Sequence, residues 1–334
     1  MNINFKIISL LALCLIPSVV FADDFPVKVD DKRVFNLVFE NDIFAGTDQG
    51  YTNGVRFAWI SSEKHSPEIV NKIARNLPHL DPNGKKRISF AFGQSMFAPK
   101  DLTQTALIVN DRPYAGWLYG SVGVVSDTGK TLDNAMLTVG VIGPLSLAED
   151  AQKFIHKRLP SSTYPRGWAN QLKNEPGIEF SYERKWRDIY EAKPFGFAVD
   201  AVPHLGVSLG NVNTNLSVGT TFRLGYDLPA DYGPPRIRPS LPGSDFFVPT
   251  QKVGGYLFTT VEGRAVARNI FLDGNTFVSS HHVDKRNFVG SLQVGAALTY
   301  GDVRVSYTHV FMTKEFKQQD TATQFGAITF SYRF

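Results

Sequence analysis

The chain has 334 residues, of which 43% are apolar, 13% aromatic and 20% charged. This length allows one large domain or two ordinary ones, and the aromatic content excludes a disordered or low-complexity protein. The formal net charge of +4 arises without any dense run of Lys or Arg, which argues against a nucleic-acid partner. The mean hydropathy of −0.13 is close to that of a soluble protein.

Residues 1–22 have the pattern of a secretory signal peptide. A short lysine-containing segment precedes the apolar run 7–16, and small residues at −3 and −1 place the cleavage site after Ala22. The apolar run is too short for a transmembrane helix. The only cysteine, Cys14, lies within this segment. We therefore expect an exported mature chain, residues 23–334, without disulfides or a thiolate nucleophile.

The mature chain contains repeated strand-like alternation and no apolar run of 18 residues, the length that a transmembrane helix needs. Short connections at 127–130, 191–192, 211–213 and 301–302 predict hairpin turns, so that neighbouring strands pair antiparallel. The twelve predicted strands are 34–41, 51–61, 87–96, 115–126, 131–143, 177–187, 195–209, 215–226, 254–271, 287–300, 303–312 and 323–334.

An even number of long alternating strands behind a signal peptide is typical of an outer-membrane protein. The sequence therefore predicts an all-β fold, a transmembrane antiparallel β-barrel of about 12 strands, formed by residues 23–334 as a single domain. The alternative is a secreted or periplasmic β-sandwich, whose strands are seldom this long. In a barrel, outward apolar and inward polar residues would average to the low mean hydropathy.

The strand order predicts which connections face the cell exterior. If the chain enters from the periplasm, the outer connections follow the odd-numbered strands; they are 42–50, 97–114, 144–176, 210–214, 272–286 and 313–322. Two long connections, 62–86 and 227–253, fall at the periplasmic end. The first contains a possible short amphipathic helix at 68–75, and the second is rich in proline and is expected to be irregular.

Polar residues gather at the outer ends of the first strands and in the outer loops. The third outer loop has apolar residues near helical spacing over 147–159, which predicts a short extracellular helix. On that helix Gln152 and His156 are four residues apart and share one face. The other candidates are Asn41 and Asp42 after the first strand, Thr52 in the second, Lys100 in the second outer loop and Glu175 in the third.

These residue types suit hydrolysis of an acyl ester by activated water. His156 would act as the general base. The oxygen atoms of Asn41, Asp42 and Thr52 are hard ligands that could hold Ca²⁺, which would stabilise the oxyanion. A solvated loop histidine and ordinary turn residues are the alternatives. The chain has no G-x-S-x-G motif, which argues against a serine nucleophile.

Five blocks of sequence resemble the outer-membrane lipid A 3′-O-deacylases, a family of calcium-dependent lipid hydrolases with twelve-stranded barrels. The matching stretches are Glu40-Asn41-Asp42 with Tyr51-Thr52-Asn53-Gly54, 111–117, 140–144 followed by Gln152 and His156, 167–177, and 182–186. They lie within residues 34–187. The second half of the chain is similar only in its alternating strands.

The resemblance implies that Asn41, Asp42 and Thr52 lie in the active site, with Asp42 as a calcium ligand. It implies that His156 activates water and that a lysine of the second outer loop takes part, for which Lys100 is the nearest candidate. Some members carry a glutamate six residues after the histidine, where this chain has Ser162; Glu175 is a possible substitute as the group that orients His156. The 3′ position of the cleaved ester follows from the resemblance alone.

The sequence thus predicts a monomeric integral outer-membrane enzyme that deacylates lipid A, the anchor of lipopolysaccharide, at the extracellular rim. Basic residues of the outer loops could attract its phosphates; these are Lys100, Arg112, Lys157, Arg158 and Arg166. The alternatives are a non-enzymatic barrel, either a channel or a structural surface protein, and an outer-membrane phospholipase.

Overall fold

The computed structural model describes residues 30–45, 50–63, 80–81, 84–158, 163–187, 190–193, 196–226, 228–235, 237 and 244–334. The predicted signal peptide and the possible helix at 68–75 lie outside these residues. No helix in these segments is long and apolar enough to cross a membrane.

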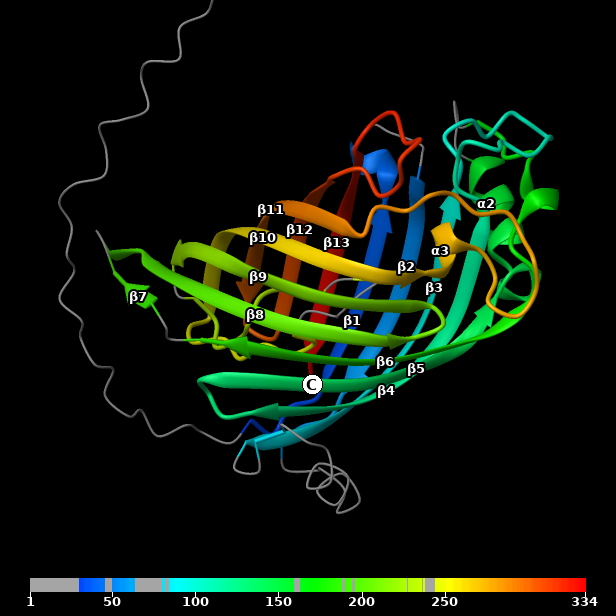
Figure 1. Ribbon diagram of the computed structural model, residues 1–334. Coiled ribbons are helices and arrows are strands. Elements are labelled where there is room, and N and C mark those ends of the chain that lie inside the picture. Colours follow the sequence, from blue (N-terminus) through cyan, green and yellow to red (C-terminus); the bar gives the residue numbers. More distant parts are fainter. Residues whose placement is uncertain are drawn as a thin grey trace, which may run out of the picture.

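Antiparallel strands form one sheet that closes on itself (Figure 1). Each strand pairs with its neighbour in the chain, and the pairs β6–β8 and β1–β13 complete the cylinder. The twelve strands of the wall are β1 (Val34–Asn41), β2 (Gly50–Ile60), β3 (Lys85–Ala98), β4 (Ala115–Asp127), β5 (Thr131–Ile142), β6 (Glu175–Trp186), β8 (Ala198–Gly210), β9 (Asn213–Tyr226), β10 (Val253–Asn269), β11 (Phe288–Tyr300), β12 (Val303–Met312) and β13 (Thr323–Arg333). The predicted fold is confirmed.

Two local predictions were wrong. A tight turn was expected at 191–192, but β7 (Tyr190–Ala192) is a three-residue strand that pairs with the start of β8. The strand expected to reach residue 271 ends at Asn269. The side chain of Asn269 accepts a hydrogen bond from the N–H of Phe271 and so starts the short helix α3 (Ile270–Asp273).

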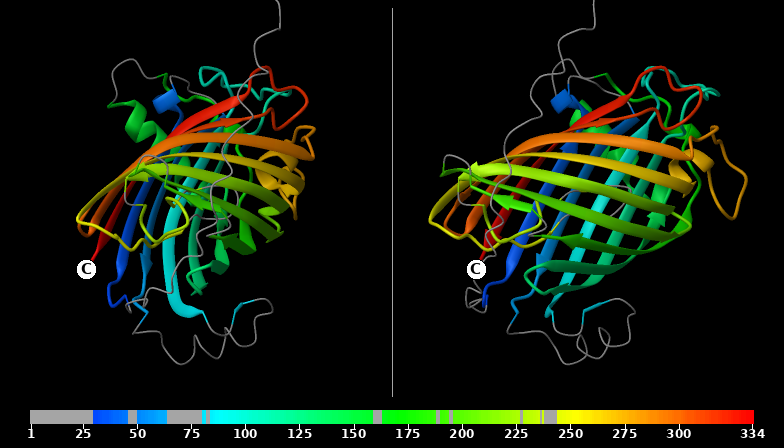
Figure 2. Two further views of the ribbon diagram at one scale, coloured as in Figure 1. Left: turned by 90° about the vertical axis from the view of Figure 1, so that its left-hand side faces the viewer. Right: turned by 60° about the vertical axis from the view of Figure 1, so that its left-hand side comes forward.

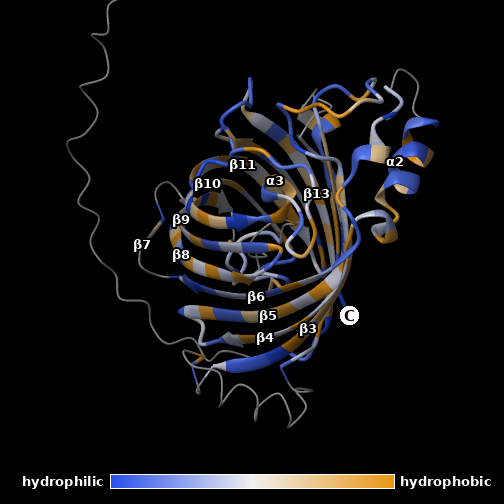
Figure 3. Ribbon diagram, turned by 45° about the vertical axis from the view of Figure 1, so that its right-hand side comes forward, coloured by the Kyte–Doolittle hydropathy of each residue, from blue (hydrophilic) through white to orange (hydrophobic). Residues whose placement is uncertain are grey.

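Side chains alternate between the two faces of the wall, as the banding in Figure 3 shows. On β6 Glu179 and Glu183 are buried, whereas Ile178, the residue before Glu179, is 53% exposed. Apolar side chains face outward on every long strand, which suits contact with lipid. This alternation explains the low mean hydropathy.

The outer connections all lie at one end of the barrel, and the C-terminus lies at the other (Figure 2). The outer loops hold the remaining short helices: η1 (Asp42–Ala45), η2 (Pro144–Ser146), α2 (Ala148–His156) and η3 (Trp168–Asn170). The extracellular helix predicted over 147–159 is therefore confirmed as α2.

The connection from β9 to β10 turns into the barrel from the periplasmic end. Its described residues form no helix or strand, as expected, and Phe246 and Phe247 are buried. Asp245 binds Arg56 of β2 through two hydrogen bonds of 2.7 Å each. Asp231 lies between Arg223 and Arg304 and is paired with both. The described part of this segment, which we call the plug (residues 228–235, 237 and 244–249), thus joins strands on opposite sides of the wall.

Loops also meet across the outer end. Arg112 of the β3–β4 loop pairs with Glu315 of the β12–β13 loop at 2.6 Å, and its guanidinium lies over the ring of Phe316. His281 of the β10–β11 loop bonds to the carbonyl of Asp111. Contacts among the described residues therefore cross the barrel at both its periplasmic and its outer end.

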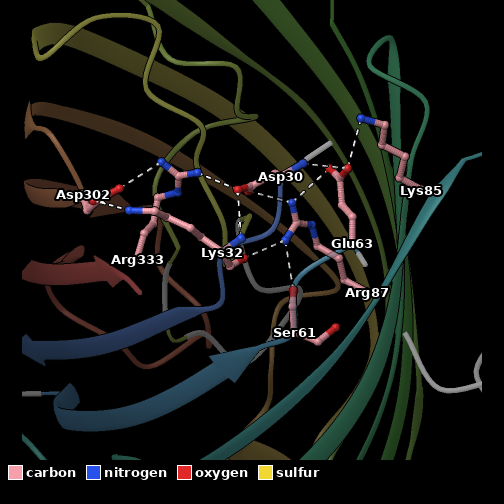
Figure 4. Close-up of polar contacts among 8 residues, drawn as sticks. All are labelled: Asp30, Lys32, Ser61, Glu63, Lys85, Arg87, Asp302 and Arg333. Atoms are coloured by element: carbon pink, nitrogen blue, oxygen red, sulfur yellow. Dashed lines mark hydrogen bonds and ion pairs between the residues drawn. The ribbon is translucent and has the colours of Figure 1, made fainter. Parts of the chain in front are cut away.

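A network of charges ties the first described residues to the barrel (Figure 4). Asp30 accepts hydrogen bonds from Arg87 of β3 at 2.9 Å and from Arg333 of β13 at 2.6 Å. Arg87 also pairs with Glu63, which follows β2, at 3.1 Å. Burial alone would raise the pKa of Asp30, but the charges of Arg333 and Arg87 outweigh it and hold the pKa below its ordinary value.

This network predicts an acid-dependent loss of stability. Because the pKa of Asp30 is lowered by folding, its contribution is present above the unfolded pKa, about 3.9, and is lost as the pH falls through the folded pKa. We expect Asp30→Asn to lower the thermal midpoint at pH 6 and to match the wild type at pH 2. Unfolding scans in detergent over this range measure the effect, and an equal difference at both pH values would contradict it.

The plug predicts a large cost for removing one buried charge. Asp231→Asn leaves the buried guanidinium groups of Arg223 and Arg304 short of a counter-charge, which costs about 3–5 kcal/mol for a buried pair. The matched control is Asp284→Asn, which breaks an exposed pair with Lys317 and should cost less than about 1 kcal/mol. Thermal unfolding of the folded barrels in detergent compares the two; equal effects would refute a role of the plug in stability.

Candidate active site

Two asparagines lie on the lipid-facing side of the wall, where apolar residues are the rule. The inward side chains of β1 include Asn36 and Glu40, which bond to the plug, so Asn41 next to Glu40 faces outward. Asn41 pairs with Asn53 of β2, which pairs with Met96 of β3. Both asparagines are nevertheless buried, so other parts of the chain cover this outer face.

Two glycines mark where the covering segments touch the wall. Gly326 of β13 pairs with Asn41, and a Cβ on it would lie 2.5 Å from the Cβ of Phe44 in η1. Gly116 of β4 pairs with Met96, and a Cβ there would lie 2.3 Å from the Cβ of Ala148 in α2. Helices η1 and α2 therefore pack on the outside of the wall, on either side of the asparagines. Figure 3 shows α2 beside the barrel, outside it.

The loop end of β1 and β2 is a compact polar group. Asn41 accepts a hydrogen bond from the N–H of Ile43 at 2.8 Å, which starts η1. Asp42 is completely buried. The backbone of Thr52 forms a bulge, because the pairing with β3 passes from Tyr51–Phe97 to Asn53–Met96. Bulges are common next to active sites because they redirect the chain locally.

Helix α2 turns its polar side to the wall. Its buried residues are Ala148, Gln152 and His156, and it packs on β3 and β4. Phe154, on the other side, is 57% exposed. The shared face predicted for Gln152 and His156 is confirmed, and it lies on the same side of the wall as Asn41. The exposed side of α2 is mixed, since Phe154 stands there with the charged residues Asp150 and Lys157.

Hydrogen bonds hold the two buried polar residues of α2, Gln152 and His156. The indole N–H of Trp168 donates to the side-chain oxygen of Gln152 at 2.7 Å. The Nδ1 atom of His156 lies 2.6 Å from the carbonyl oxygen of Thr163. A carbonyl only accepts, so Nδ1 carries the proton and Nε2 is the basic nitrogen.

Lys100 lies at the same end of the barrel but in a different setting. Its side chain is 55% exposed and its Nζ is 3.9 Å from Asp320. It lines a cavity of 670 Å³ between the β3–β4 and β12–β13 loops, with Asp101 and Asp111. Hydrogen bonds from Thr103 lower the pKa of Asp101, so this carboxylate is charged at neutral pH. Lys100 is thus a cation among carboxylates.

Glu175 is not brought to His156. It pairs with Ile142, whose side chain packs in the inner apolar cluster of the barrel, so Glu175 faces the lumen. Its carboxylate accepts hydrogen bonds from Asn211, Asn275 and the N–H of Thr276. The wall separates it from α2, and its contacts join three outer loops to one another. Spacing along the sequence could not reveal this, because it depends on which face each strand residue takes.

Metal-ligand chemistry at the polar group would have to come from mixed oxygen donors. Among the described residues, no three His, Cys, Asp or Glu side chains gather closely enough to hold a metal ion. Asp42, the residue after Asn41, is completely buried, and Asn41 pairs with the buried Asn53 across β1 and β2. A carboxylate with amide and carbonyl oxygens fits Ca²⁺.

These features define an integral outer-membrane β-barrel with a buried polar site on the lipid-facing side of its extracellular end. A family model described as Outer membrane protein LpxR matches residues 7–334. The chain belongs to this family, the outer-membrane lipid A 3′-O-deacylases that its sequence blocks resemble. The match extends well beyond residues 34–187, to which the resemblance was confined.

The solved structure of one LpxR protein has the same fold. The chain is similar to LpxR from Salmonella typhimurium, with a TM-score of 0.73 and 20% identity over 90% of this chain and 100% of that one. The β domain of the Bordetella autotransporter BrkA has a TM-score of 0.46 and 9% identity over 91% of this chain and 100% of that one. No curated protein sequence matches this chain.

Asn53 and Trp168 belong to the site although neither was predicted as a functional residue. Asn53 lies beside Asn41 through the strand pairing, and Trp168 fixes Gln152. Both stand within the sequence blocks that resemble the family. The signal that could have identified Asn53 is a polar residue at an outward position of an alternating strand.

The contact of α2 with Gly116 predicts a sharp effect of one methyl group. In Gly116→Ala the new Cβ would meet Ser146 Oγ at 2.1 Å and Ala148 Cβ at 2.3 Å, so α2 must move off the wall. We expect lipid A deacylation to fall by about 10²-fold, with heat-modifiable gel mobility retained. The control is Gly120→Ala on the same strand, where the nearest atom is 3.9 Å away. Mass spectrometry of lipid A measures the activity, and equal activity of both variants would contradict the contact.

Proposed function

We propose that the protein hydrolyses an acyl ester of lipid A on the outer face of its wall, with His156 as the base that activates water. The observation that carries the proposal is the 2.6 Å contact between His156 Nδ1 and the Thr163 carbonyl. This contact fixes the tautomer in which Nε2 is basic and limits rotation of the ring. The family resemblance supports the 3′ ester as the bond that is cleaved.

Asn41, Asp42 and Thr52 would hold a calcium ion, as the resemblance suggests; the burial of Asp42 and of its neighbour Asn41 supports this role. The ion would supply positive charge that polarises the ester carbonyl. His156 Nε2 would take a proton from the attacking water and pass it to the leaving alcohol. No covalent intermediate on the protein is needed.

Lys100 would bind an anionic group of the substrate head. Its ammonium is exposed and its pairing with Asp320 is long, at 3.9 Å. A phosphate would replace a weak exposed ion pair with a charge-assisted hydrogen bond. We propose that the enzyme acts as a monomer, as the sequence analysis expects.

The position of the site suits a substrate that stays in the membrane. The two exposed apolar side chains Leu147 and Phe154 would contact acyl chains of the outer leaflet, and the exposed charges of Lys157 and Arg158 would lie at the level of the lipid head groups. The ester of lipid A lies just below its sugars, at the extracellular rim. Substrate would therefore reach His156 sideways along the wall rather than through the lumen.

Two substitutions test the catalytic assignment. His156→Ala removes the base and Asp42→Asn removes the one carboxylate of the polar group, so each should lower deacylation by at least about 10²-fold. Purified variants with unchanged heat-modifiable mobility are incubated with lipid A and Ca²⁺, and mass spectrometry follows loss of an acyl or acyloxyacyl group. Activity in His156→Ala equal to that of the wild type would refute the proposal.

Further arms of the same assay separate the alternatives. Chelation should abolish activity and added Ca²⁺ restore it, whereas full activity in chelator would refute the metal. Glu175→Gln should keep activity within several-fold, because Glu175 faces the lumen; a loss as large as that of His156→Ala would restore it as the orienting group. Cleavage of glycerophospholipids at a comparable rate would favour the phospholipase alternative.

A further inference from the structure

A second hollow lies on the outer wall, away from the candidate active site. It is an open groove of 710 Å³ along the outer ends of β9, β10, β11 and β12. The candidate site lies on β1 to β4 and reaches β13, the strand next to β12, so the two sites share no strand. Outward apolar residues line the groove, among them Leu216, Val218 and Phe288, all more than half exposed.

Two paired glycines form the floor of the groove. Gly263 of β10 pairs with Gly290 of β11, and both take the outward positions of their strands. A Cβ on Gly263 would meet nothing within 4 Å, and one on Gly290 would first meet Thr313 at 3.6 Å. The missing side chains therefore leave space at the lipid-facing surface, and neither backbone conformation demands glycine.

The extracellular edge of the groove carries two cations, Arg286 and Lys314. Both are exposed, and neither forms an ion pair within the described residues. Their neighbours differ: Lys285 pairs with Asp273 at 2.9 Å and Lys317 pairs with Asp284 at 3.3 Å. Lys285 and Lys317, which lie outside the groove, are therefore paired with carboxylates, whereas Arg286 and Lys314 at its edge are not.

We propose that this groove binds lipid A as a second site, with acyl chains on the glycine floor and phosphates at Arg286 and Lys314. An apolar trough below a cationic edge is complementary to an anionic lipid whose head lies at the outer surface. Arginine and lysine both bind phosphate, arginine through a planar pair of donors. Two separate cations suit a glycolipid with two phosphates better than a phospholipid with one.

The groove would bind lipid A and has no residues that could catalyse its hydrolysis. Its lining residues include no histidine and no carboxylate, so it offers neither a base nor a calcium ligand. It would hold lipid A next to the enzyme without cleaving it and would anchor the barrel in the glycolipid leaflet. The proposal uses the outer-membrane location and does not require that the candidate active site be catalytic.

Two independent changes test the groove. Arg286→Glu with Lys314→Glu reverses the charge at its edge, and Gly263→Leu fills its floor. Both are made in a His156→Ala background, so that bound lipid A is not consumed. Native mass spectrometry of the barrel in detergent counts bound lipid A as its concentration is raised. We expect each change to weaken binding of one lipid A molecule by at least about tenfold.

Matched controls make the same changes elsewhere. Lys317→Glu with Lys173→Glu alters the net charge equally outside the groove, and Gly120→Leu adds the same side chain to the outer face of β4. Both should bind lipid A as the background protein does. Phosphatidylglycerol at equal concentration is the comparison lipid and should not displace lipid A.

The outcomes are distinct. Unchanged lipid A binding in both groove variants would overturn the proposal, as would equal binding of phosphatidylglycerol that is lost in the same variants. If one variant does not fold, as judged by heat-modifiable mobility, the other decides. Deacylation is measured separately in the wild type with Ca²⁺, so a failure of the catalytic proposal shows as absent mass loss and leaves the binding count unaffected.

Discussion

The closed backbone pairing of the wall is the constraint on which the rest of this molecule depends. In lipid every backbone N–H and C=O must be paired, and closure from β13 to β1 achieves this without a free edge. Closure also assigns each strand residue to the lumen or to lipid, with a period of two. A polar residue on the lipid side is therefore costly unless something covers it. Asn41 and Asn53 are such residues, and η1 and α2 provide the cover.

Polar residues that point into the lumen also need partners. Arginines point into it from several strands, and a buried charge is tolerated only with a partner. The plug brings Asp231 and Asp245 to Arg223, Arg304 and Arg56. The described interior is therefore held together by paired charges. The candidate site lies on the other face of the wall, where Asn41 and Asn53 point away from the lumen.

The sequence was sufficient for features that depend on local periodicity. Alternation over two residues predicted the barrel, and spacing on α2 placed Gln152 and His156 on one face. It was insufficient where the answer depends on register. Glu175 stands near the other candidates along the chain, yet its pairing with Ile142 turns it to the lumen. The plug was expected only as an irregular connection, because its partners Arg56 and Arg304 are far away in the sequence.

Helix α2 lies between the polar group on the wall and the exterior of the barrel. A helix on a soluble protein buries its apolar side, whereas α2 buries Gln152 and His156 and exposes Phe154. The exposed side carries Phe154 together with charged residues, whereas the two buried polar residues lie against the same outer face of the wall as Asn41. A basic histidine nitrogen can stay there only if its other nitrogen has a fixed partner, which the Thr163 carbonyl supplies. The proposed second site at Gly263 depends on the same lipid surroundings. A Cβ there would meet nothing within 4 Å, and on a surface that faces lipid this space would take an acyl chain rather than water.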